Sequence, residues 1–527
     1  MGTFNNRIHA RYYENHSKGL SIHLKSYKLY LTIFNIQSEE FPMHPKLMKP
    51  IVDNIKSTIF CISVVSIFIF SLTLVLINPI QSEAADHPVL TLSDAVQNSL
   101  ENNRELMAVR FDSKASKHGK SEAYSSYFPQ VSFLNSMSKV TSSRYEFDMP
   151  DDSPLAGMFD TDQLGFSGAN YVNSINVSQL IFDRSVIGQI KLSKLREEAA
   201  QWQETGQEQS VVYNTVVAYI NVLRSQELLN VQKQRLALAD KQLNSATTNF
   251  EVGMRIRTDV LRAQLSRSSA LRDVNSAEIA LQNSQVQLNQ IIGNPIDNLY
   301  TFQIDQLANF NPSSKNLDVV QNYPKLFALA KEKHPSIKVA SLLVDQTKES
   351  VNIARGEFAP RASAGGRWGF NESGRVEFEE EEWALTFQVE IPIFEGGRKI
   401  AKMKRTKAQL NAQQKRYEDA IRAISSMVEQ SALALQEEQR NMEISLEAEI
   451  VAKENHERFL NLYEEGLADS LDVTQALTEL VEAQTNVVTT RYGYLSVYTQ
   501  LLNTMGLTSV NPTPYSSNDW LMELNNF

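Results

Sequence analysis

Residues Trp383-Ala-Leu-Thr-Phe-Gln-Val-Glu-Ile391 alternate strictly: every odd-numbered position is large and apolar, and every even-numbered position is small or polar. A period of two predicts a β-strand with one apolar face. The same alternation with a period of two occurs near residues 130–141, 171–182 and 361–370. Each stretch has roughly 9–12 residues, which is the length of a tilted strand that crosses a bilayer. The strand that contains residues 383–391 is the second of the pair formed with 361–370, and it is expected to extend from 383 to 394.

Each pair of strands is followed by a long segment without proline, over 186–250 and over 399–462. Apolar residues recur there at helical spacing, as at Val212, Val216 and Leu223. At 1.5 Å per residue such a helix is about 100 Å long. Its remaining positions are rich in Gln, Glu, Lys and Arg, so the sequence predicts coiled-coil rods rather than membrane-spanning helices.

A turn ends each rod. Gly253 and Gly466 stand where a left-handed C-cap residue is expected, and Asp259 and Asp472 begin the returning helices.

A shorter helix opens each repeat, over about 92–127 and 324–358. It is expected to stop before Pro129 or Pro360, because proline cannot continue a helix. Pro335 is expected to kink or break the second of these helices.

The same unit occurs twice in the chain. Glu101–Phe133 aligns with Glu332–Ala364 at an offset of 231, and the turn at Gly253 aligns with the turn at Gly466 at an offset of 213. The period is too long for a solenoid, so we interpret it as an internal duplication. The predicted parts are a first repeat (85–293), a connector (294–323), a second repeat (324–506) and a C-terminal tail (507–527).

The N-terminal region predicts export. Residues 59–77 are nearly all apolar, and Ser82-Glu83-Ala84 follows as a cleavage site. We therefore expect a signal peptide over 48–84, with Met48 as the natural start and residues 1–47 as a mis-assigned extension. The alternative is a retained anchor, because this segment of nineteen residues, interrupted only by Ser and Thr, can also span a bilayer.

Composition excludes several classes of function. The 51 Lys and Arg residues against 61 Asp and Glu give a net charge of −10, which provides no basic footprint for nucleic acid. Cys61 is the single cysteine, so no internal disulfide or Cys-rich zinc site can form. Histidines lack ligand spacing, and no nucleotide-binding or nucleophile motif occurs. We predict a protein that is no enzyme and that has no metal and no cofactor.

Alternation alone also fits a soluble antiparallel sheet. The export signal, the rods and the aromatic residues near the loop-side strand ends (Tyr171, Trp368, Phe370 and Trp383) favour the membrane. Four strands cannot close a barrel, and open edges are not tolerated in lipid. The expected fold class is therefore membrane α/β, with four transmembrane strands per chain in a barrel shared between copies and long coiled-coil helices that continue it.

Five segments together resemble the TolC-type outer-membrane efflux protein family (outer-membrane factors). They are Leu90–Asn103, Tyr127–Phe133, Phe250–Val260, Ile393–Gly397 and Tyr463–Val473. The resemblance implies a homotrimer with a twelve-stranded barrel in outer-membrane lipid and a helical tunnel in the periplasm. It also implies a passive exit duct, for efflux or type I secretion, that meets an inner-membrane pump through a periplasmic adaptor (membrane-fusion) protein.

The resemblance also implies a constriction at the helix tips. Asp259 and Asp472 match the acidic position of each repeat, Tyr463 matches a gate aromatic, and Arg255 occupies the basic position that is Ala468 in the second repeat. Gln475 departs from the pattern, because a second carboxylate is often found there. An aspartate at a helix start is also an ordinary cap or dipole partner, and we weigh that reading above a gate.

The tip turns, 250–260 and 463–473, are expected to dock the adaptor, through Gly253, Met254, Gly466 and Leu467. Two other functions stay open: a periplasmic coiled-coil adaptor or scaffold with an uncleaved anchor, and a surface fibrous protein.

Overall fold

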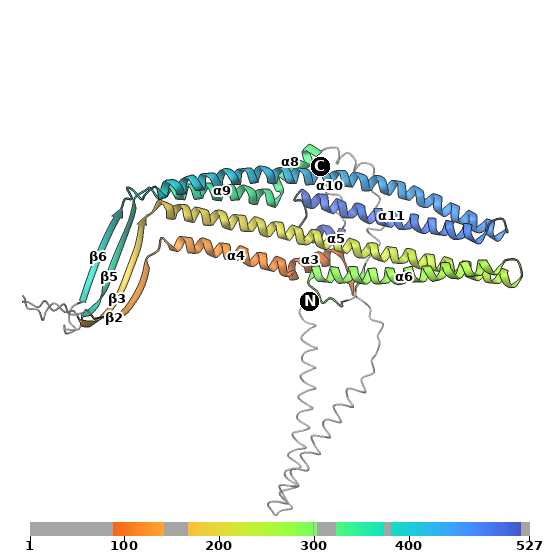
Figure 1. The fold of residues 1–527 in the computed structure, drawn as a ribbon, viewed down its shortest axis with the longest axis horizontal. Coiled ribbons are helices and arrows are strands. Elements are labelled where there is room, and N and C mark those ends of the chain that lie inside the picture. Colours follow the sequence, from red (N-terminus) through yellow and green to blue (C-terminus); the bar gives the residue numbers. More distant parts are fainter. Residues whose placement is uncertain (1–87, 142–166, 299, 303–322, 374–380, 518–527) are drawn as a thin grey trace, which may run out of the picture. The chain divides into compact units, whose positions relative to one another are not determined.

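The computed structural model describes residues 88–141, 167–298, 300–302, 323–373 and 381–517 (Figure 1). They belong to one compact unit, His87–Phe527. The predicted extension, the predicted signal peptide and most of the predicted connector lie outside the described residues. Among the described helices, none combines the length and the apolar composition needed to cross a membrane.

The four strands form one antiparallel sheet in the order β2-β3-β5-β6 (Figure 1). Strand β6 ends at Glu390 and not at residue 394, because Pro392 has no N–H for a ladder hydrogen bond. The bounds are β2 Gln130–Thr141, β3 Ser167–Phe182, β5 Arg361–Ser373 and β6 Glu381–Glu390.

The register of the sheet places the apolar positions of all four strands on one face. Phe133 lies opposite Ile175, Ile175 opposite Trp368, and Trp368 opposite Trp383. These side chains are exposed, and Trp368 packs edge-on against Phe370 at 5.5 Å between ring centroids. Among the described residues, this apolar face of the sheet therefore has no cover.

Two long helical hairpins follow the strands. Helix α5 (Arg184–Glu251) turns back as α6 (Arg257–Ile292), and α10 (Arg398–Glu464) turns back as α11 (Ser470–Thr504). Helix α5 begins directly after β3, and α10 begins after the short segment that follows β6. The tip turns therefore lie at the opposite end of about 100 Å of helix from the sheet.

Both short helical segments are broken at the same place. The break predicted at Pro335 is confirmed, because α8 (Tyr323–Lys333) ends before it and α9 (Pro335–Gly356) begins there. The single helix predicted over 92–127 is wrong: α3 (Leu92–Asn102) and α4 (Arg104–Ser125) are separate helices. The cause is Asn103, whose side chain accepts a hydrogen bond from the N–H of Leu106 over 3.0 Å and so caps α4.

His334 is the equivalent of Asn103 at the offset of 231. Its Nδ1 accepts a hydrogen bond from the N–H of Ser336 over 3.1 Å, which caps α9. Burial lowers the pKa of His334, and this favours the neutral ring that can accept this bond.

A two-residue parallel bridge ties the N-terminal end of the first repeat to the beginning of the connector. It joins β1 (Val89–Leu90) to β4 (Thr301–Phe302). The Tyr219 hydroxyl donates to the carbonyl oxygen of Leu90 over 3.0 Å, and its ring meets Phe302 edge-on at 5.6 Å. Beyond the connector, the Tyr323 hydroxyl contacts Ser425 of α10. Both ends of the connector are thus fixed to the long helices.

The main core lies where α5 and α11 pack together with the short helices. Its largest fully buried side chains include Tyr492, Tyr494, Tyr498 and Leu495 of α11 and Leu223 of α5. Helix α12 (Thr513–Ser517) closes this region, where the Ser93 hydroxyl donates to the carbonyl of Pro512 over 3.1 Å.

Candidate functional site

The two tip turns have the same backbone geometry. Gly253 and Gly466 have φ of 77° and 82°, as the C-cap prediction requires. Met254 and Leu467 each donate from N–H to the carbonyl oxygen five residues earlier, over 2.8 Å. This bonding satisfies carbonyls that the end of a helix otherwise leaves unpaired.

Apolar side chains stand out from both turns. Met254 is 77% exposed and Leu467 is 74% exposed, and Val252, Ile256 and Leu471 are exposed beside them. A cluster of exposed apolar residues at the end of a rod is typical of an interaction surface. We call these five residues the tip patch.

Arg255 joins the two tips. Its Nη2 donates to the carbonyl oxygen of Tyr463 over 2.6 Å, and its Nη1 lies 3.5 Å from the carbonyl oxygen of Ala468. The guanidinium carbon lies 4.2 Å from the centroid of the Tyr463 ring, which is a cation–π contact. The cation that the second repeat lacks at Ala468 is thus supplied there by the first repeat. We call this set of contacts the Arg255 clasp.

Tyr463 is close enough to Arg255 and Asp259 for both charges to act on it. Tyr463 is 2% exposed, and its hydroxyl has no hydrogen-bond partner among the described residues. Burial raises the pKa of Tyr463 above its ordinary value, the Arg255 charge lowers it, and the Asp259 charge raises it further. Asp259 is itself buried, in the first turn of α6. The structure therefore brings three of the four constriction candidates together.

Asp472, the fourth candidate, forms a cap. Its carboxylate accepts from the N–H of Asp469 over 3.1 Å, while Asp469 accepts from the N–H groups of Leu471 and Asp472. This is a capping box, the ordinary role that we weighed against a gate. We did not predict the part of Asp469, although the Asp-x-x-Asp spacing signals it. Asp259 differs, because Ile256 at the N-cap of α6 provides no side-chain hydrogen bond.

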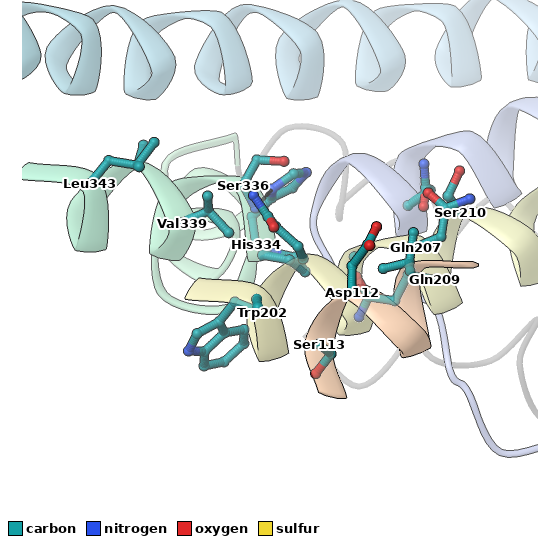
Figure 2. A pocket seen from close by; sticks show the side chains of 17 residues that line it. Asp112, Ser113, Trp202, Gln207, Gln209, Ser210, His334, Ser336, Val339 and Leu343 are labelled. Carbon is teal, nitrogen blue, oxygen red and sulfur yellow. Dashed lines mark hydrogen bonds between the residues drawn. The ribbon is translucent and has the colours of Figure 1, made fainter. Parts of the chain in front are cut away.

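A cavity of about 630 Å³ lies at the helix breaks, between α4, α5 and α9 (Figure 2). Trp202 and Leu343 line it with apolar surface, while Asp112 and His334 supply polar groups. Gly206 of α5 allows α9 to come close, because a Cβ there would lie 3.2 Å from Pro335. No sequence motif indicated this cavity.

Comparisons with known proteins agree with this architecture. A family model described as "Outer membrane efflux protein" matches residues 95–294 and 326–507, one match for each repeat. The chain is 24% identical over 360 residues to the outer membrane protein TolC of Escherichia coli, a match that covers 63% of this chain and 69% of TolC.

Two further proteins extend the comparison. The outer membrane efflux protein BepC of Brucella suis is 24% identical over 425 residues, with 79% of this chain and 85% of BepC covered. The solved CmeC outer membrane channel of Campylobacter jejuni has a TM-score of 0.66 at 18% identity, with 83% of this chain and 89% of CmeC covered. At that identity the structural likeness shows the fold alone.

Proposed function

The chain belongs to the outer membrane efflux protein family, and on that premise we propose that three copies assemble into one continuous exit duct. It is an outer-membrane protein with its helices in the periplasm, as its relatives are. An inner-membrane pump would supply the energy, and a periplasmic adaptor would join pump to duct.

The observation that carries the proposal is the sheet. Its apolar face is exposed along all four strands, and β2 and β6 are edge strands that lack a second neighbour within the described residues. In lipid every backbone polar group needs a partner, so an open edge must pair with another copy. Pairing β6 of one copy with β2 of the next removes both edges, and three copies give the twelve-stranded barrel that the family resemblance implies.

The tips are proposed to hold both the constriction and the docking surface. The Arg255 clasp, with Tyr463 and Asp259, would keep the two hairpins of a copy together and the tunnel narrow. Met254 and Leu467, with the glycines that shape their turns, would meet the adaptor through the tip patch. Asp472 is proposed to act as a cap and to affect the constriction only by holding α11 in place.

A periplasmic adaptor or scaffold is the second function that the sequence leaves open. It is less well supported, because the apolar face of the sheet would then have to meet water or an additional protein. Surface-exposed apolar area of that extent is unfavourable in a soluble protein.

Thiol labelling on intact cells tests the topology. Cys61 is the single cysteine, so Cys61→Ser gives a background without thiols. In that background Glu382→Cys places a thiol at the loop end of β6, and Leu467→Cys places one at a tip. We expect a membrane-impermeant maleimide to label Glu382→Cys on intact cells and Leu467→Cys only after the outer membrane is breached. Labelling of Glu382→Cys only after breaching, with the protein expressed, would reject the duct.

A further inference from the structure

Basic residues are concentrated at the start of both long helices. Residues 398–416 of α10 contain eight Lys or Arg and no Asp or Glu. Residues 417–464 of the same helix contain four Lys or Arg and eleven Asp or Glu. Residues 184–196 of α5 contain four Lys or Arg and no acidic residue. The whole chain has a net charge of −10, so these two basic segments are local exceptions to its acidic composition. One of them occurs in each repeat.

This charge pattern opposes the helix dipole. The N-terminus of a helix is its positive end, so acidic side chains stabilise it and basic ones do not. Neither α5 nor α10 has an acidic residue in its first turn, and neither has a basic residue in its last turn. Helix stability therefore does not explain the pattern, and an anion outside the helix would.

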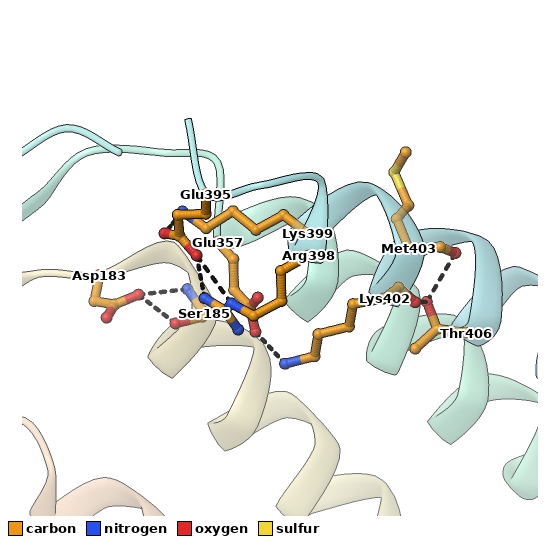
Figure 3. Close-up of polar contacts among 9 residues, drawn as sticks. All are labelled: Asp183, Ser185, Glu357, Glu395, Arg398, Lys399, Lys402, Met403 and Thr406. Carbon is orange, nitrogen blue, oxygen red and sulfur yellow. Dashed lines mark hydrogen bonds and ion pairs between the residues drawn. The ribbon is translucent and has the colours of Figure 1, made fainter. Parts of the chain in front are cut away.

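Part of the basic charge of α10 is neutralised within the chain (Figure 3). Glu395 pairs with Arg398 and, over 2.7 Å, with Lys399. Lys402 pairs with Glu357, which follows the end of α9. These contacts hold the start of α10 against the neighbouring chain segments.

The next basic residues of α10 have no such partner. Lys404, Arg405 and Lys407 are exposed and form no hydrogen bond or ion pair with any described residue. The same holds in α5 for Lys191, Lys194 and Arg196. Two groups of three cations without a partner among the described residues thus stand at a similar level in the two repeats, about two to three turns after the start of each long helix.

Exposed apolar side chains lie between the sheet and these cations. Ile393 is 94% exposed and Phe394 is 84% exposed, in the segment that links β6 to α10. In the other repeat, Ile181 and Phe182 at the end of β3 are exposed just before Arg184 begins α5. Apolar and aromatic side chains followed by Lys and Arg are typical of a surface at the level of lipid headgroups.

We propose that residues 184–196 and 398–416 form a basic collar that binds anionic phospholipid headgroups of the periplasmic leaflet. Phosphate is the anion that Lys and Arg bind with charge-assisted hydrogen bonds, and a polybasic surface attracts anionic lipid. The exposed Ile393 and Phe394 would contact the acyl chains beside the headgroups. The proposal rests on the insertion of the sheet in the outer membrane and adds a lipid partner to the duct.

The charges of the neighbouring helix favour lipid over protein as the partner. The last part of α4 contains Lys114, Lys117 and Lys120 against Glu122 alone, and Lys120 already pairs with Glu197 of α5 over 2.5 Å. If an adjacent copy brings its α4 beside α10, it therefore brings more positive charge and no excess of carboxylates.

Native mass spectrometry of the full chain in detergent tests the collar. The protein is titrated with phosphatidylglycerol and, separately, with phosphatidylcholine of the same acyl chains, at low and at high salt. The test variant is Lys404→Gln/Arg405→Gln/Lys407→Gln. The matched control, Arg422→Gln/Lys453→Gln/Arg458→Gln, removes the same charge from exposed positions of the same helix far from the strands.

We expect the wild type to bind phosphatidylglycerol more tightly than phosphatidylcholine, with a preference that weakens at high salt. The test variant should bind phosphatidylglycerol on the order of 100-fold more weakly, because each cation near an anionic surface contributes about a fivefold factor. The control variant should bind as the wild type does.

Equal binding of the two lipids by the wild type, or equal losses in the test and control variants, would overturn the collar. So would a test variant that loses its oligomeric mass but keeps its lipid preference, because its cations would then pair with a neighbouring copy. The lipid titration is independent of the maleimide experiment. A protein that passes the labelling test and shows no lipid preference rejects the collar and leaves the duct intact.

Discussion

Arg255→Ala should open the tunnel. The change removes the cation that links the tip of the first hairpin to the carbonyl oxygens of Tyr463 and Ala468 and to the Tyr463 ring. Nothing else in the Arg255 clasp connects the two tips through a charge. We expect the hairpins of each copy to separate more often.

The size of the effect follows from the contacts. The 2.6 Å bond from a charged donor is worth about 1.5–3 kcal/mol. The 3.5 Å contact adds little, and a cation–π contact at this partly exposed arginine adds about 0.5–1 kcal/mol. Since the side chain is partly in water, we take about 2 kcal/mol in total, which is about a 30-fold rise in the population of separated tips.

Planar bilayer recordings measure the population of separated tips as the fraction of time that single channels spend open. Sensitivity of cells to a large hydrophilic antibiotic provides an independent readout. Arg257→Ala is the matched control, because Arg257 lies in the same tip, is exposed and has no ion pair or hydrogen bond of its side chain with a described residue. Arg255→Lys should be intermediate, since it keeps the charge and loses the planar fork.

Two results would refute the reasoning. If Arg255→Ala channels open no more often than wild-type channels, the clasp does not hold the tips. If Arg257→Ala opens the channel equally, loss of positive charge at the tip is the cause and the specific contacts are not.

Three further predictions concern stability. Tyr463→Phe removes a buried hydroxyl that has no hydrogen-bond partner among the described residues, and it should raise the free energy of unfolding by up to about 1 kcal/mol. Thermal unfolding measures this, and a lower midpoint in the variant would mean that the hydroxyl is hydrogen-bonded in the assembly. Gly369→Ala should lower the free energy of unfolding by about 3 kcal/mol or more and reduce the amount of folded protein in the outer membrane, because the new Cβ would lie 2.3 Å from the carbonyl oxygen of Asn173. Gly365→Ala is the control and should be tolerated, because its Cβ would lie 3.6 Å from the nearest atom. Equal yields of the two variants would contradict the register of the sheet. Burial lowers the pKa of His334 below 6.5, so the unfolded chain binds the proton more readily and stability is lost as the pH falls from 6.5 through the folded-state pKa. His334→Asn keeps a cap that does not titrate, and it should therefore reduce the difference between the thermal midpoints at about pH 7.5 and about pH 5.5. An unchanged difference would mean that other groups cause the pH dependence.

Much of the architecture follows from local sequence. The parity of residues 383–391 depends only on the pleat, and the glycines at 253 and 466 only on the need for a positive φ. These signals lie within a few residues of one another. For that reason the sequence was sufficient to predict strands, rods and turns.

Contacts between the repeats were beyond such signals. Arg255 could be aligned with Ala468, but only the fold shows that it reaches the carbonyl of that same residue. The break at Asn103 was missed because an asparagine does not by itself exclude a continuous helix, whereas the proline at 335 cannot continue one. The β1–β4 bridge was missed because two residues give no period to detect.

That bridge makes the connector a convenient position for an epitope or affinity tag. Phe302 contacts α5 and Tyr323 contacts α10. Residues added between these two fixed points should therefore not displace the sheet or the tips. A detection sequence inserted within 303–322 should leave folding and export intact.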